Sequence, residues 1–115
     1  MKELESFIYV VRVKETVTIS IDPQNGAGEE ETAMAVDGKA LESSGGTKPT
    51  YTFADTQQVG NHFGVLECDF ARAPDGAQFI VSLKGSVDGQ AQFTVKKTDA
   101  IHDVDLEFRV RTNQD

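Results

Sequence analysis

The sequence has no tryptophan, one cysteine and only two histidines among its 115 residues. A single cysteine, Cys68, cannot form an internal disulfide, and this fits the reducing cytoplasm, where we expect the protein. No stretch is long and apolar enough to span a membrane, and the first residues lack the pattern of a cleavable signal. We therefore expect neither a membrane segment nor a secretory leader in this sequence.

Basic residues are also few: 11 Lys and Arg stand against 19 Asp and Glu, which gives a net charge of −8. They are scattered, whereas nucleic acids and anionic membranes are bound by clustered Lys and Arg. We expect no nucleic acid and no membrane as partner. The hydrophobic fraction of 38% is that of a globular chain, and the length suits one domain over residues 1–115.

Alternating apolar residues predict β-strands through most of the chain. Residues 7–21 form the longest run, and we expect a bend near Glu15 where the strand passes from one sheet to another. Residues 103–111 alternate apolar with charged side chains, which predicts a half-buried antiparallel strand. Residues 62–71 begin with apolar side chains on both faces, as does the stretch around Ile8, so we expect cover on both sides there.

The first of two hairpin signals lies in residues 77–97, where two alternating runs flank Val87-Asp88-Gly89. We expect a three-residue loop with Gly89 in the left-handed conformation, because that register places Leu83 opposite Phe93 and keeps one face apolar.

The second signal is Asp37-Gly38, which is expected to join a strand at Ala33–Val36 to one at Lys39–Leu41. The alternative is a short helix in the stretch EEETAMA, which contains good helix formers.

These patterns together predict an all-β fold. The expected architecture is an antiparallel β-sandwich of roughly seven to nine short strands, jelly-roll-like or Ig-like, with a small barrel as the alternative. Turn signals recur along the chain and no long helical pattern interrupts them.

The candidate metal ligands are Asp99, Asp103 and Asp105. Asp103 and Asp105 lie two apart on a predicted strand and share a face, and Asp99 precedes them in a loop. Hard oxygen ligands supplied by a loop and a strand end suit calcium. The alternative is an ordinary solvated strand face, balanced by Arg109 and Arg111.

The candidate ligand-binding residues are Tyr51, Asn61 and His62, all in the irregular segment 43–62. Long polar loops on a rigid β scaffold commonly carry binding sites. Tyr51 is the one aromatic residue expected to be exposed, so it is the candidate for stacking on a sugar ring.

No catalytic motif is present: the sequence lacks a nucleophile elbow and a phosphate-binding glycine loop, and Cys68 shares a face with Leu66 and Phe70. We therefore expect a non-enzymatic domain, without a cofactor, that acts by contact with another protein or by self-association. The alternative is a carbohydrate-binding or calcium-dependent module using the 43–62 loop and the acidic loops. A third hypothesis is an enzyme whose site assembles from scattered residues.

Overall fold

The structure is a computed structural model that describes residues 5–13, 15–28, 31–45, 48–53, 59–86 and 89–111. Within these ranges every regular element is a β-strand and no helix occurs. The strands are β1 (Glu5–Arg12), β2 (Val17–Gln24), β3 (Thr32–Val36), β4 (Lys39–Ala40), β5 (Thr50–Phe53), β6 (Gly60–Asp69), β7 (Gln78–Ser86), β8 (Gly89–Lys96) and β9 (Ile101–Arg111).

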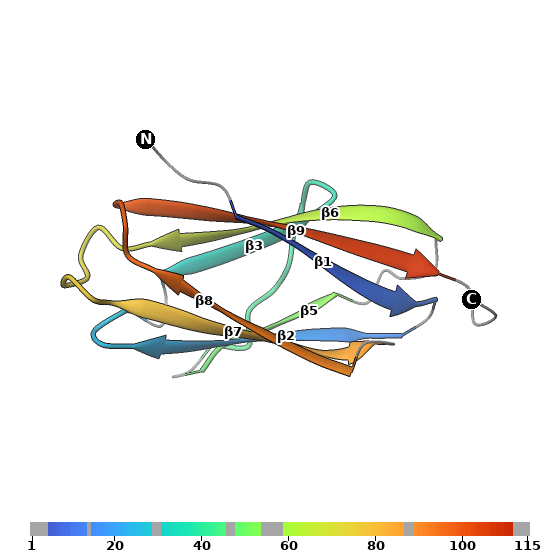
Figure 1. Cartoon of the computed structure of the whole chain (residues 1–115), viewed down its shortest axis with the longest axis horizontal. Helices are drawn as coiled ribbons and strands as arrows, with labels where there is room; N and C mark the ends of the chain where they lie inside the picture. The colour runs from blue at the N-terminus through green and yellow to red at the C-terminus, as the bar shows by residue number, and fades with distance from the viewer. Residues whose placement is uncertain are drawn as a thin grey trace.

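These strands form two sheets (Figure 1). The larger sheet has five strands in the order β1-β9-β6-β3-β4, and the smaller has four in the order β5-β2-β7-β8. Neighbouring strands run antiparallel, apart from β1 and β9, which run parallel. No ladder among the described strands joins the two sheets, so the predicted all-β class is confirmed and the barrel alternative is wrong.

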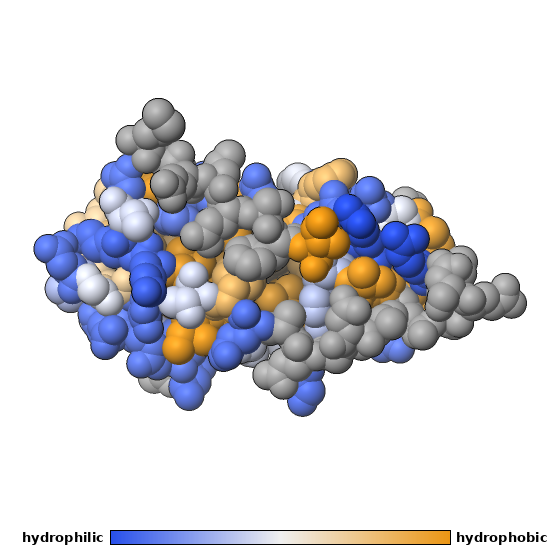
Figure 2. Space-filling model, in the orientation of Figure 1, coloured by the Kyte–Doolittle hydropathy of each residue, from blue (hydrophilic) through white to orange (hydrophobic). Residues whose placement is uncertain are grey.

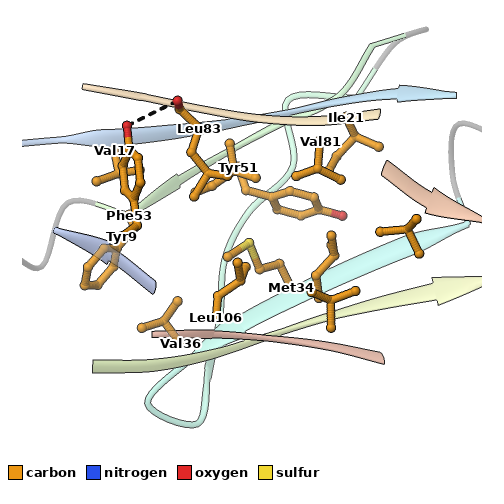
Figure 3. Close-up of a cluster of buried hydrophobic side chains, with 14 of the residues drawn as sticks. Tyr9, Val17, Ile21, Met34, Val36, Tyr51, Phe53, Val81, Leu83 and Leu106 are labelled. Atoms are coloured by element: carbon orange, nitrogen blue, oxygen red, sulfur yellow. Dashed lines mark hydrogen bonds between the residues drawn. The ribbon is translucent and has the colours of Figure 1, made fainter. Parts of the chain in front are cut away.

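The inward-facing side chains of both sheets belong to one hydrophobic cluster. Figure 3 shows Tyr9, Met34 and Leu106 from the larger sheet facing Val81 and Leu83 from the smaller one. Tyr9 also ties the sheets together directly, because its hydroxyl donates a hydrogen bond to the Leu83 carbonyl at 3.2 Å. A buried tyrosine needs such a partner, since an unpaired hydroxyl in an apolar interior is costly.

The predicted bend near Glu15 is confirmed. β1 lies at an edge of the larger sheet, whereas β2 lies inside the smaller sheet, so the chain changes sheets between Arg12 and Val17. Glu15 and Thr16 are exposed at this crossing. The alternating pattern continues on both sides of the crossing because each half buries one face.

The Asp37-Gly38 hairpin is confirmed, and the helix alternative for this region is wrong. β3 and β4 pair through Ala35–Ala40 and Val36–Lys39, which leaves Asp37 and Gly38 as a two-residue turn. Both have positive φ angles, 52° and 79°, as a type I′ turn requires. Glu29 and Glu30, where the alternative helix was to begin, lie outside the described residues.

The predicted register of the β7–β8 hairpin is wrong. Leu83 pairs with Ala91 and Val81 with Phe93, two residues away from the expected pairing. A slip of two residues keeps the same side chains on the inner face, so hydrophobic alternation alone cannot tell the two registers apart. Val87 and Asp88 lie outside the described residues.

A bulge at Gly85 accounts for one residue of the difference in register, and the pairing of Ser86 with Gly89 accounts for the other. The pairing shifts between Lys84 and Ser86, and Gly85 has a φ of 101°. A Cβ atom at Gly85 would overlap the carbonyl oxygen of Thr16, in the crossing between the sheets. Glycine is required here both for the backbone conformation and for the close approach of another segment.

Replacing Gly85 with alanine is expected to destabilise the protein more than the same change at Gly38. Both glycines have positive φ, which costs alanine about 1–2 kcal/mol, but a Cβ at Gly38 meets nothing within 4 Å. Gly85→Ala adds the overlap with the Thr16 carbonyl, for a total loss of about 3 kcal/mol or more. Urea unfolding of both variants measures the difference, and equal losses would contradict this explanation of the bulge.

Candidate functional site

Tyr51 is not exposed, contrary to the sequence-based expectation. It lies in β5, its side chain faces the core, and the residue is 3% exposed. Its hydroxyl lies 2.9 Å from both the carbonyl oxygen and the side-chain oxygen of Thr32, and it donates to the carbonyl. Tyr51 therefore fills the core with a satisfied polar tip, and its ring is not available to stack on a sugar.

The three predicted calcium ligands do not converge. Asp103 and Asp105 point outward from β9, while Asp99 lies in the bend before it and accepts a hydrogen bond from the Ala100 amide at 2.8 Å. In the ranges that the structure describes, no group of three or more His, Cys, Asp or Glu side chains is placed to hold a metal ion. Asp103 and Asp105 therefore lie on the outward face of β9 and are not gathered with Asp99 around one point.

His62 and Asn61 lie at the start of β6 and point in opposite directions, with Asn61 exposed and His62 buried. The Nδ1 atom of His62 lies 2.6 Å from Oδ2 of Asp37, in the turn between β3 and β4. The imidazole also packs against Phe53 of β5, with 5.7 Å between the ring centroids. His62 therefore connects a turn of the larger sheet to a strand of the smaller one.

Asp37 holds the backbone of Phe63 from both sides. Its Oδ1 accepts the Phe63 amide at 3.0 Å, and its own amide donates to the Phe63 carbonyl at 2.8 Å. Partial burial raises the pKa of Asp37, but the hydrogen bonds from His62 and Phe63 and the positive charge on His62 and Lys39 outweigh it. The net effect is a pKa below the ordinary aspartate value of 3.8.

Phe63 is itself exposed, and so is its neighbour Val65 on the same side of β6. Phe63 is 60% exposed and Val65 is 42% exposed, although both belong to a regular strand in the middle of the larger sheet. The expected cover over this side of β6 is absent from the described residues. Ile8 of β1 is likewise 55% exposed, and Figure 2 shows apolar surface over β1.

Small apolar residues continue this surface across β3 and β4. Val65 lies opposite Ala35, and Ala35 lies opposite Ala40. We call the outward side of these three strands the apolar face, made up of Ala33, Ala35, Ala40, Phe63 and Val65. Because the alanine side chains are short, they leave a hollow of about 230 Å³ lined by Ala33, Met34, Ala35, Ala40, Val65 and Glu67.

Carboxylates border the apolar face along the neighbouring strand β9. Asp105 lies opposite Val65 and Asp103 lies opposite Glu67, so acidic groups flank the hollow on one side and at one end. Glu107, further along β9, forms an ion pair with Arg109. Glu67 is therefore the carboxylate that lines the hollow itself.

A second hollow lies in the segment that the sequence marked as a binding loop. It measures about 420 Å³ and is lined mainly by polar residues: Ala40, Leu41, Glu42, Ser43, Ser44, Thr50 and Thr52. Its hydroxyl groups can donate and accept hydrogen bonds, but Ser44 already bonds to the backbone of Gly45 and Thr50. Residues 46–47 and 54–58 of the predicted 43–62 loop lie outside the described residues.

Sequence reasoning missed the exposure of Phe63 and Val65, although a signal was present. Both faces of β6 are apolar at this point, and a strand in a two-sheet protein has only one face that the other sheet can cover. No helix occurs among the described residues to form a third layer, and Phe63 and Val65 are exposed on the second apolar face.

Family models, curated proteins and solved structures give no match to this chain. The described part of the chain contains no helix suited to crossing a membrane.

Asp37→Asn is expected to destabilise the protein at about pH 5.5 and to have less effect at about pH 3. Because the folded-state pKa is lowered, the ionised Asp37 stabilises the fold above 3.8, and this contribution disappears as the pH falls through the folded-state value. Urea unfolding at the two pH values measures the change. Asp75→Asn, at a fully exposed position, is the matched control. A loss of unfolding free energy in Asp37→Asn that is larger at about pH 3 than at about pH 5.5 would contradict this expectation.

Proposed function

We propose that the two sheets pack as a β-sandwich, that residues 1–115 form one domain, and that this domain binds another protein without catalysis. The binding surface is the apolar face. The observation that supports this proposal is the exposure of Phe63 and Val65 side by side on a regular central strand, next to a shallow hollow.

The energetics of the apolar face favour binding. Covering an exposed side chain of this size contributes about 1.5–3 kcal/mol, and aromatic residues beside a pocket are typical centres of binding energy. Phe63 is also fixed in place, because Asp37 bonds to its backbone at both the amide and the carbonyl. A partner would therefore meet a surface that needs little ordering on binding.

Carbohydrate binding at the hydroxyl-lined hollow is the second candidate, favoured by Ser43, Thr50 and Thr52 in its wall. It ranks lower because sugar sites usually include an exposed aromatic ring, and Tyr51 is buried. For location, we propose the cytoplasm, because a sequence with a single cysteine fits a reducing compartment.

Substituting Phe63 is expected to weaken partner binding, whereas a serine substitution on the outer face of the other sheet is not. Phe63→Ser removes the largest side chain of the apolar face, and Ile80→Ser is the control because Ile80 points outward from β7 in the smaller sheet. Proteins retained by the immobilised wild type are identified, purified and titrated against all three forms by calorimetry.

The expected result is a partner bound equally by wild type and Ile80→Ser and at least about tenfold more weakly by Phe63→Ser. Sedimentation of the free protein is run in parallel, since a dimer that Phe63→Ser dissociates would identify a second copy as the partner. If every retained protein binds Phe63→Ser as tightly as wild type, and no dimer depends on Phe63, the proposed function is wrong.

A further inference from the structure

We infer that the partner presents a lysine or arginine side chain that enters the hollow of the apolar face, with its cationic group at Glu67. This inference rests on the proposed function and adds the chemistry of the partner: a basic protein segment in which apolar residues accompany the cation.

The shape of the hollow suits one long, flexible side chain. Its volume of about 230 Å³ equals that of about eight water molecules in the liquid. The lining is apolar apart from one residue: it consists of the alanines of β3 and β4, Met34 and Val65, and Glu67 is its charged member. Lysine and arginine match this arrangement, because their methylene stems cover apolar surface while their charged ends stay in water.

The charges around the hollow favour a cation in the same place. Glu67 lies directly opposite Asp103 on the neighbouring strand, so this end of the hollow is bordered by acidic residues. Within the described ranges Glu67 takes part in no ion pair, whereas Glu107 on the same face is paired with Arg109. A partner cation at Glu67 would supply the ion pair that Glu67 does not make within the described residues.

The same charges disfavour a second copy of the chain as the occupant. Each copy carries a net charge of −8, and a face-to-face dimer would bring two acidic borders together around the apolar centre. A basic partner instead makes a favourable contact and associates faster, because opposite charges steer the two proteins together.

Amide NMR titration with two blocked five-residue peptides tests this inference. One peptide alternates valine with lysine, and its twin alternates valine with glutamate. The expected result is saturable shifts of the amides around the apolar face of β3, β4 and β6 with the lysine peptide and none with its twin. Binding should weaken as salt is added, since the contact is partly electrostatic.

Two variants that each remove one negative charge separate a local contact from a general charge effect. Glu67→Gln removes the carboxylate at the hollow, while Asp22→Asn removes one that follows buried Ile21 and points outward from the smaller sheet. Glu67→Gln should raise the dissociation constant of the lysine peptide about threefold to tenfold, and Asp22→Asn less than about twofold.

Equal effects of the two variants would overturn the inference, because they would show attraction to net charge alone. Equal amide shifts with both peptides, or no shifts with the lysine peptide, would overturn it too. Amide shifts at the apolar face that change with protein concentration and not with peptide would also overturn it, because they would indicate self-association. In each of these cases the proposed function still stands if Phe63→Ser weakens binding of the captured partner or dissociates a dimer, and it fails if Phe63→Ser does neither.

Discussion

The period-two alternation of strand side chains is the constraint on which the structure depends. Along β9 each buried residue is followed by a partly exposed one, from His102 to Val110, and β6 pairs with β9 over its whole length. A slip of one residue would move every core side chain of a strand to the solvent side, so this pairing is strongly specified. The inner faces are thereby committed to the core, where His62 and His102 are the buried polar residues among those described, and the charged side chains of β9 lie on its outer face.

On the outer face of the larger sheet, neighbouring strands differ in the side chains that they present to solvent. β9 carries charged side chains, as expected for a strand that faces solvent, while its neighbour β6 carries Phe63 and Val65. The Asp37–His62 contact lies at the edge of this region and fixes the backbone at Phe63. A rigid support beneath an exposed aromatic ring is the arrangement that links the fold to the proposed binding role.

Much of the fold could be predicted from the sequence because alternation and turn chemistry are local signals. They located the strands, the change of sheet near Glu15 and the Asp37-Gly38 turn. They could not decide the β7–β8 register, because a two-residue slip preserves the buried face, and the choice depends on the contact of Gly85 with Thr16, which is distant in the sequence. The candidate site was harder for the same reason: the burial of Tyr51 and the exposure of Phe63 depend on which sheet covers each strand.

In the proposed role, Phe63 and Val65 contribute to binding and not to folding. Urea unfolding of the double variant Phe63→Thr, Val65→Thr tests this claim directly, because threonine preserves the preference for strand while removing the apolar surface. The account predicts an unfolding free energy within about 1 kcal/mol of the wild type, the scale of cross-strand contacts on an open face. A loss of about 3 kcal/mol or more, as expected on truncating buried Leu66 to alanine, would show that the two side chains belong to the core and would contradict the account.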